Sequence, residues 1–179
     1  MLTLASRSPQ RKRILEQLGV EFRVEPADVE ELTDGDPRTV VVENALRKAR
    51  AIDGERVLGA DTEVFLNDRI FGKARTEDEA RSYLEELSGA THEVWGGIAV
   101  IDGDGERTAH AVTHVTFAPL DDTRMEWYLA TGEWRDRAGA YAIQGLGSAL
   151  VERIEGDFWN VVGLPVPELL RLAPKLLTP

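Results

Sequence analysis

The stretch that decides how this chain folds is Leu2-Thr3-Leu4-Ala5-Ser6-Arg7-Ser8-Pro9-Gln10-Arg11-Lys12-Arg13. An apolar strand over 2–5 is followed by a predicted helix over 9–18, because Ser8 is a good N-cap and Pro9 suits the first helical position. Three basic residues then lie near the helix N-terminus, where the helix dipole favours anions. The first turn is therefore either a phosphate site, made of free N–H groups, hydroxyls and guanidinium groups, or a solvated basic turn.

Strand and helix signals are mixed along the rest of the chain, without a regular β-α-β alternation. We therefore expect a mixed α/β (α+β) fold, with helices packed around a mixed sheet rather than a purely parallel one. The segments 27–36 and 139–147 are expected to be loops. The predicted strands are 2–5, 22–24, 56–65, 69–71, 93–101, 107–117 and 149–154, and the predicted helices are 9–18, 37–49, 77–87, 122–130 and 165–172.

Composition limits the possible classes of protein. The chain has 179 residues, 42% of them hydrophobic and 30% charged, which suits one domain spanning 1–179 with a sizeable core. Its net charge of −11 argues against a nucleic-acid polymer as partner, although a local cationic pocket can still hold a nucleotide. With no cysteine, no secretory signal pattern and no apolar run near the roughly 20 residues of a membrane span, we expect a cytoplasmic protein that does not act at a membrane.

Asp61 interrupts an apolar strand in the segment Leu58-Gly59-Ala60-Asp61-Thr62-Glu63-Val64-Phe65. Burying an unpaired carboxylate is costly, so Asp61 is expected to meet a metal, a cation or water, and its small neighbours leave room for a ligand. The alternative is a strand-end aspartate bonded to nearby backbone. Lys73, which follows the next predicted hairpin, either returns to the neighbourhood of Asp61 or stays solvated.

Two further segments carry candidate ligand-binding groups. Acidic residues gather between 28 and 36, followed by Glu43 and Lys48, and their oxygens suit Mg²⁺ or Mn²⁺; such a charge run also fits a solvated loop. Glycines in 136–145 allow a close approach of backbone to a ligand, and Gln144 offers both a donor and an acceptor for a base edge. Taken alone, this second segment also fits a structural turn.

Six segments, each a weak signal alone, occur together and in one order. They are Leu4-Ala5-Ser6-Arg7-Ser8-Pro9-Gln10-Arg11, Glu43-Asn44-Ala45-Leu46-Arg47-Lys48-Ala49, Gly59-Ala60-Asp61-Thr62, Gly72-Lys73, Gly139-Ala140-Tyr141-Ala142-Ile143-Gln144-Gly145 and Asn160-Val161-Val162-Gly163-Leu164-Pro165. Together they resemble the Maf family of nucleoside triphosphate pyrophosphatases over essentially the whole chain. The resemblance implies an elongated two-lobed α/β fold, related to the inosine-triphosphate pyrophosphatases, with the nucleotide in a central cleft. It also implies a divalent metal, Mg²⁺ or Mn²⁺, and commonly a homodimer.

The resemblance also implies roles for individual residues. The segment 139–145 is similar to that of the subgroup acting on dTTP and UTP. The family usually has arginine at Gln10, so that one phosphate contact is expected either to be weaker or to be supplied by Arg13. It usually has lysine at Arg137, where the charge is kept but its geometry differs. The implied phosphate-binding residues are Ser8, Arg11, Arg13, Lys48 and Lys73, the implied base-reading residues are Gln144 and Arg137, and the implied metal ligands are Asp61 and Glu31, with Glu30 less favoured.

We interpret Asp61 as the catalytic residue that orients or deprotonates the water attacking the α-phosphorus, directly or through the metal. The cations would neutralise charge on the triphosphate as it shifts toward the leaving pyrophosphate. Two alternatives remain open at this stage. One is a nucleotide-binding regulator of cell division without significant catalysis, and the other is a pyrophosphatase for modified or deaminated nucleotides.

Overall fold

The structure is a computed structural model and describes residues 1–177. Within this part of the chain, seven strands form one sheet in the order β2-β1-β3-β5-β6-β7, and β4 pairs with β3 outside this path. The strands are β1 (Leu2–Leu4), β2 (Phe22–Val24), β3 (Arg56–Leu66), β4 (Arg69–Phe71), β5 (Thr91–Asp102), β6 (Gly105–Phe117) and β7 (Val151–Glu155). The helices are α1 (Pro9–Gln17), α2 (Pro37–Arg50), α3 (Glu77–Leu87), α4 (Asp122–Ala130), α5 (Phe158–Val162) and α6 (Val166–Leu172), with a 3-10 helix over Leu146–Leu150.

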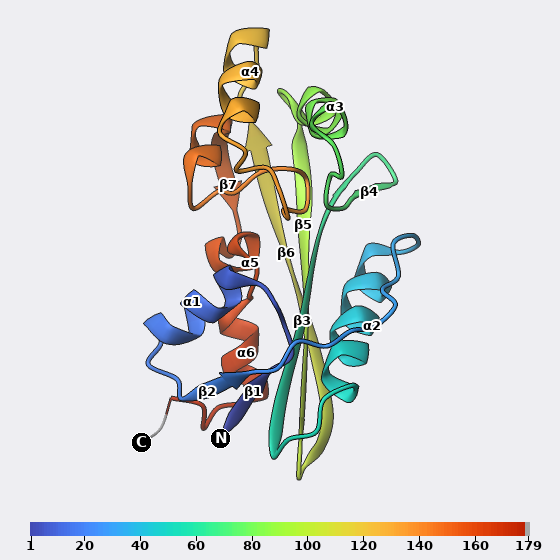
Figure 1. Ribbon diagram of the computed structural model, residues 1–179, viewed down its shortest axis with the longest axis vertical. Helices are drawn as coiled ribbons and strands as arrows, with labels where there is room; N and C mark the ends of the chain where they lie inside the picture. The colour runs from blue at the N-terminus through green and yellow to red at the C-terminus, as the bar shows by residue number, and fades with distance from the viewer. Residues whose placement is uncertain (178–179) are drawn as a thin grey trace.

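The predicted mixed sheet is confirmed. Strand β1 pairs parallel with both β2 and β3, whereas the other strand pairs are antiparallel. The long strands β3, β5 and β6 run through most of the molecule, with β1, β2, α1 and α6 around one end and α3, α4 and β7 around the other (Figure 1). The fold class expected from the sequence is therefore the fold class observed.

Several bounds differ from the sequence prediction: β5 begins at Thr91 rather than 93, β6 begins at Gly105 rather than 107, and the predicted loop 139–147 ends in a 3-10 helix that starts at Leu146. The last strand was expected over 149–154, but β7 begins at Val151 because Ala149 and Leu150 belong to the preceding 3-10 helix. The short helix α5 was not predicted, since its five residues are too few to show a hydrophobic period. Asp157 caps α5 by accepting a hydrogen bond from the backbone N–H of Trp159, 2.9 Å away.

One edge of β3 has a gap in its strand pairing. The edge toward β5 is paired from Arg56 to Phe65. On the other edge, β1 pairs with residues 56–58 and β4 with residues 64–66. Among the described residues, no strand pairs with 59–63 on that second edge, so this segment of β3 is open to side chains and ligands from that direction.

Helix α2 lies directly against the sheet beside this gap. A Cβ atom on Gly59 would stand 2.0 Å from the carbonyl oxygen of Ala45, and one on Gly97 would stand 2.2 Å from that of Val41. Only glycine allows the α2 backbone to approach β3 and β5 so closely. The side chains of α2 that face the sheet are therefore brought within reach of the open segment of β3.

Among residues 1–177, buried apolar side chains form three clusters that support these elements. The first joins α3, α4 and the C-terminal part of β3, the second joins α1, α6 and β1, and the third, which is small, lies between α2 and the sheet. Within the described residues, no helix is long and apolar enough to cross a membrane.

Candidate active site

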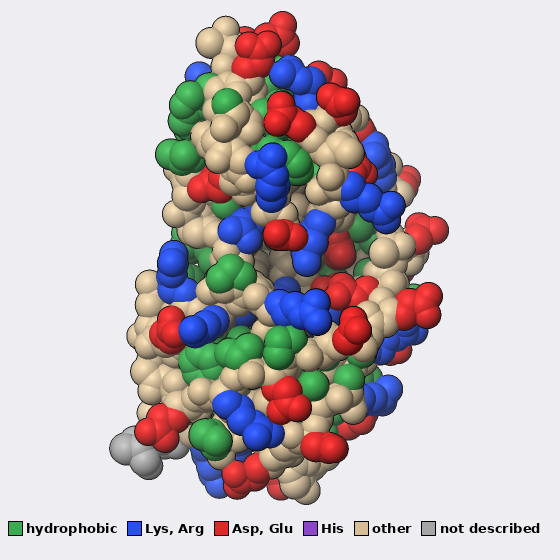
Figure 2. Space-filling view, in the orientation of Figure 1, with side chains coloured by type: hydrophobic (Ala, Val, Ile, Leu, Met, Phe, Trp, Pro, Cys, Tyr) green, Lys and Arg blue, Asp and Glu red, His purple; other side chains and the backbone are tan. Residues whose placement is uncertain are grey.

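The open segment of β3 lies in the middle of the molecule, between the elements that surround the two ends of the sheet. Figure 2 shows a hollow across this middle region, with Lys and Arg side chains gathered around it and Asp or Glu side chains between them. The candidate site is built from β3, α1, α2 and the loops that reach this region.

Asp61 of β3 is buried and has two side-chain partners on α2. Its Oδ1 accepts a hydrogen bond from Lys48 Nζ at 2.7 Å, and its Oδ2 accepts one from Asn44 Nδ2 at 2.9 Å. Both oxygens act as acceptors, which is the state of an ionised carboxylate. The expectation that Asp61 meets a cation is confirmed, and its alternative, a carboxylate bonded to nearby backbone, is wrong.

Lys48 brings Glu31 into the same cluster. The Nζ atom of Lys48 lies 3.1 Å from Glu31 Oε2, and the side chain of Lys48 is 10% exposed while that of Glu31 is 42% exposed. Lys48 therefore links the carboxylate of Glu31 to that of Asp61. Glu30 contributes its backbone carbonyl group, which accepts a hydrogen bond from Arg47.

Arg11 approaches β3 from α1. The guanidinium group is buried and donates from Nε to Gly163 O at 2.9 Å, from Nη1 to Ser6 Oγ at 3.0 Å and from Nη2 to Thr62 Oγ1 at 3.1 Å. Burial lowers the pKa of Arg11, and the nearby carboxylates of Asp61 and Glu31 oppose that shift. The charge of Arg11 is thus held beside the acidic cluster.

The rest of the α1 N-terminus is arranged as the sequence predicted, apart from the role of Arg13. Ser8 is the N-cap, and its Oγ accepts a hydrogen bond from the backbone N–H of Arg11 and donates one to Gln10 Oε1 at 3.1 Å. Arg13 is exposed and stands about 200° around the helix axis from Arg11. The side chain of Arg13 therefore projects from a different face of α1 than that of Arg11. This geometry does not support Arg13 as a substitute for an arginine at position 10.

Glu63 is a site residue that the sequence reasoning missed. Its Oε2 is buried and has no hydrogen-bond partner among the described residues. Burial, and then the charges of Asp61 and Glu31, raise the pKa of Glu63 to about 8, while Lys48 and Lys73 oppose the shift. The signal that could have found it is the period of two in a strand, which puts residues 61 and 63 on one face.

Lys73 is exposed, and its backbone forms an isolated antiparallel bridge with Ala138. The backbone N–H of Gly139 also donates to Phe71 O at 2.8 Å. The segment that contains Arg137 is therefore held beside Lys73. Lys73 is close enough to Glu63 to act on its pKa, which supports a return of Lys73 to the neighbourhood of the acidic cluster.

Gln144 is exposed on a turn whose backbone N–H groups are hydrogen-bonded to the side chains of Tyr128 and Glu133. The hydroxyl of Tyr128 accepts a hydrogen bond from the N–H of Ala142 at 3.1 Å. The two carboxylate oxygens of Glu133 accept from the N–H groups of Leu146 and Gly147 at 3.0 and 2.8 Å. The Gln144 side chain is thus exposed on a turn that these hydrogen bonds hold, and within residues 1–177 no hydrogen bond or ion pair joins it to the Asp61 cluster.

The acidic groups of the site suit a divalent cation that is shared with a ligand. Mg²⁺ typically takes one or two carboxylates from the protein and completes its shell with substrate phosphates and water. Among the described residues, no three His, Cys, Asp or Glu side chains surround one position. The unpartnered oxygen of Glu63 and the paired carboxylates of Asp61 and Glu31 nonetheless give the hard oxygen donors that such a cation prefers.

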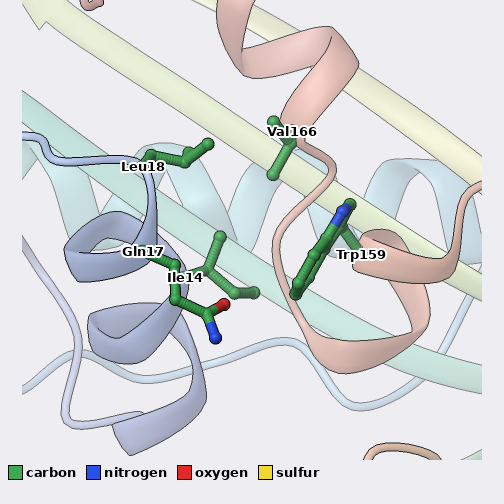
Figure 3. A pocket seen from close by; sticks show the side chains of 5 residues that line it. All are labelled: Ile14, Gln17, Leu18, Trp159 and Val166. Atoms are coloured by element: carbon green, nitrogen blue, oxygen red, sulfur yellow. The ribbon is translucent and has the colours of Figure 1, made fainter.

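A separate cavity of about 310 Å³ lies between α1 and the start of α6 (Figure 3). It is lined by Ile14, Gln17, Leu18, Trp159 and Val166. These side chains are mostly apolar, and none of them belongs to the cluster around Asp61. A second hollow, of about 500 Å³, lies between α2 and β6 and is likewise separate from that cluster.

A family model and two named relatives each match almost the entire chain. The family model described as Maf-like protein matches residues 1–176. A dTTP/UTP pyrophosphatase from Anaeromyxobacter sp. (strain Fw109-5) is 48% identical over 178 residues, which cover 96% of this chain and 87% of that protein. A dTTP/UTP pyrophosphatase from Pyrococcus furiosus is 43% identical over 179 residues, covering 96% of this chain and 93% of that protein. Among solved structures, the Staphylococcus aureus Ham1 protein matches with a TM-score of 0.46 and 15% identity, over 65% of this chain and 71% of that one.

Proposed function

The chain belongs to the Maf family, and on this premise we propose that it hydrolyses nucleoside triphosphates, above all dTTP and UTP, to the monophosphate and pyrophosphate. Relatives that are 43% and 48% identical and are named dTTP/UTP pyrophosphatases support this substrate class. The observation that carries the proposal is the buried carboxylate of Asp61, held by Lys48 and Asn44 at the open edge of β3 with the charge of Arg11 nearby.

This arrangement suits hydrolysis better than binding alone. A site that only binds a triphosphate gains from cations and loses from added carboxylates, because like charges repel. Here Asp61, Glu31 and Glu63 lie within electrostatic reach of one another. Such a concentration of carboxyl groups is useful where a water must be oriented or deprotonated, or where a divalent cation is bound with the substrate.

Each residue of the site has a proposed role in the reaction. Asp61 orients the attacking water and accepts its proton, and Lys48 holds the Asp61 carboxylate in place while its charge faces the phosphates. Ser8, Arg11 and Lys73 bind phosphate oxygens and stabilise the charge that moves toward the leaving pyrophosphate. Gln144 contacts the base from the turn described above and Arg137 contacts it from the segment beside Lys73, whereas Arg13 contributes only long-range charge.

We also propose that a divalent cation, Mg²⁺ or Mn²⁺, is bound by Asp61 together with Glu31. When bound, such a cation neutralises phosphate charge and lowers the pKa of a coordinated water. The residues of this chain do the remaining work: Asp61 supplies the carboxylate, Arg11, Lys48 and Lys73 supply the positive charge, and Gln144 and Arg137 contact the base. A single domain over 1–179 with this hollow as its cleft, a homodimeric state and a cytoplasmic location stay predictions.

The deciding experiment measures product release across a panel of canonical, methylated and deaminated triphosphates, with Mg²⁺ and with Mn²⁺. Pyrophosphate and the monophosphate should form together, fastest from dTTP and UTP. Release of single phosphates would make the protein a phosphatase. Equal, near-background rates on every substrate would instead favour the nucleotide-binding regulator.

A further inference from the structure

Asn44 of α2 is fully buried, and both the nitrogen and the oxygen of its side-chain amide form hydrogen bonds at the site. Its Nδ2 donates to Asp61 Oδ2 at 2.9 Å and to the carbonyl oxygen of Leu32, also at 2.9 Å. Its Oδ1 accepts from the backbone N–H of Leu32 at 2.7 Å. One side chain thus joins the catalytic carboxylate to the backbone next to Glu31.

The orientation of this amide follows from its partners. Asp61 Oδ2 and Leu32 O can only accept, while the N–H of Leu32 can only donate. If the amide were turned over, its oxygen would face two acceptors and its nitrogen would face a donor. The three hydrogen bonds are therefore satisfied in one orientation alone, which also holds one rotamer of the Asp61 carboxylate.

The loop over 25–35 is tied to α2 at three positions of one helix face. Asn44 holds Leu32, Arg47 Nη1 donates to Glu30 O at 3.0 Å, and Lys48 pairs with Glu31 at 3.1 Å. Residues three and four apart lie on the same side of a helix, so these attachments form one row. Of the three, Asn44 and Lys48 also contact Asp61.

We propose that Asn44 is a positioning residue that sets the Asp61 carboxylate and the Glu31 loop in one fixed arrangement. The inference rests on the proposed hydrolase function. Lys48 supplies charge to Asp61 on its Oδ1 side, whereas Asn44 directs Oδ2 without adding charge. Removing Asn44 frees Asp61 to rotate about its side-chain torsions and frees Leu32 from α2, while the cations that face the phosphates stay in place.

The test compares variants that separate these two attachments. Asn44→Ala removes both, and Asn44→Asp keeps an oxygen acceptor for the N–H of Leu32 but places an oxygen, not a donor, against Asp61. Arg47→Ala loosens the same loop without touching Asp61. Asn160→Ala removes a second fully buried asparagine, whose Nδ2 donates to Val94 O at 2.9 Å and to Thr113 Oγ1 at 3.1 Å. Steady-state kinetics on dTTP, melting temperature and amide hydrogen exchange are measured for all four.

Both Asn44 variants should lose about 10- to 100-fold in kcat with less than about a threefold change in KM, as expected for a residue that orients a catalytic group. Exchange over 25–35 should rise strongly in Asn44→Ala and less in Asn44→Asp. Arg47→Ala should raise exchange while keeping kcat, and Asn160→Ala should lower the melting temperature while keeping kcat. If either Asn44 variant fails to fold, Asn44→Ser replaces it.

The inference is overturned if folded Asn44 variants keep the kcat of the native enzyme, or if Asn160→Ala loses as much kcat as they do. It is equally overturned if Arg47→Ala alone reproduces the loss, because loop mobility would then explain it. Failure of the underlying function is recognised separately, since the native protein itself would then release no pyrophosphate, whereas the exchange of the 25–35 amides would still report the structural role of Asn44.

Discussion

Asp61 and Thr62 are consecutive residues of β3 whose side chains leave the strand on opposite faces, and each contacts a different helix. Asp61 is bonded to Lys48 and Asn44 of α2, and Thr62 Oγ1 accepts a hydrogen bond from Arg11 of α1 at 3.1 Å. Because no strand among residues 1–177 pairs with this part of β3 on its outer edge, groups from both faces can meet a ligand there. The alternation of a strand thus brings the acidic and the basic halves of the site together.

The first prediction concerns Asp61. Asp61→Asn should lower kcat roughly a hundred- to ten-thousand-fold while the protein stays folded, because an amide cannot accept a proton from water. The matched control is Asp102→Asn, which changes a largely buried carboxylate paired with Arg56 and Arg107 at the end of β5. Pyrophosphate release and circular dichroism check both variants. A turnover for Asp61→Asn similar to that of the control would contradict the role of Asp61.

The second prediction concerns metal removal. Treatment with EDTA should stop pyrophosphate release, and added Mg²⁺ or Mn²⁺ should restore it, because the carboxylates of Asp61 and Glu31 suit a hard divalent cation. Electron paramagnetic resonance of Mn²⁺ gives a readout that does not depend on turnover. Asp61→Asn should weaken Mn²⁺ binding relative to Asp102→Asn. A rate that is unchanged in EDTA would rule out the metal.

The third prediction uses the pKa of Glu63, which burial and the charges of Asp61 and Glu31 raise from an ordinary 4.5 to about 8. Between these values the folded protein holds a proton that the unfolded chain has released, so stability falls as pH rises from 4.5 to 8. Glu63→Gln removes this dependence. In EDTA, its melting temperature should exceed that of the native protein at pH 8, and the difference should shrink toward pH 5.

The control for Glu63 is Glu85→Gln on the exposed side of α3, which should leave the pH dependence of the melting temperature unchanged. If Glu63→Gln followed the native curve at every pH, Glu63 would have to ionise in the folded state as readily as in the unfolded chain. The assignment of a neutral, buried Glu63 near pH 7 would then fail.

The fourth prediction concerns the turn that carries Gln144. A Cβ atom on Gly145 would stand 2.0 Å from Glu133 Oε1, so Gly145→Ala must displace the carboxylate that holds the N–H groups of Leu146 and Gly147. We expect KM for dTTP and UTP to rise several-fold and discrimination between bases to fall, with the melting temperature lowered by a few degrees. Glu133→Ala should reproduce both effects.

The matched glycine control is Gly103→Ala, at the turn between β5 and β6, where an added Cβ meets nothing within 4 Å. It should leave KM, base preference and melting temperature unchanged. Unaltered base discrimination in both Gly145→Ala and Glu133→Ala would remove this turn from base recognition.

The fifth prediction concerns His92, whose Nε2 lies 2.9 Å from the hydroxyl of Tyr141 in the first apolar cluster. Burial lowers its pKa from 6.5 to about 4. The unfolded chain binds a proton there before the folded protein does, so this residue costs stability as pH falls from 6.5 to 4, by roughly 3 kcal/mol at most. Urea unfolding of His92→Gln should show a flatter dependence over this range than the native protein.

Local signals in the sequence were sufficient for most elements. Ser8 with Pro9, and Asp36 with Pro37, mark helix starts that the structure confirms as N-caps followed by proline. The lack of a regular β-α-β alternation indicated the mixed sheet, which the parallel and antiparallel pairing confirms. These features depend on neighbouring residues, so a single sequence contains them.

The same local signals predicted only part of the candidate site. Asp61 could be found because a carboxylate in an apolar strand needs a partner, but the identity of that partner could not. Asn44 was part of a quoted motif without a role, and Glu63 was passed over beside Asp61. The role of Asn44 comes from contacts with Leu32 and Asp61, 12 and 17 positions away, which no local pattern reports, whereas Glu63 was within reach of the strand period that places it on the face of Asp61.

By itself, the sequence determined where α1, α2 and α3 begin, which carboxylates could not be buried without a partner, and that the chain contains the basic and acidic side chains of a phosphate and metal site. Tertiary structure decided which of them meet. The close packing of α2 on Gly59 and Gly97 sets Lys48 and Asn44 against Asp61, while the gap between β1 and β4 leaves that part of β3 open. The physical reason is that helix caps and strand patterns act between near neighbours, whereas burial, charge pairing and an unpaired sheet edge exist only once distant segments are packed together.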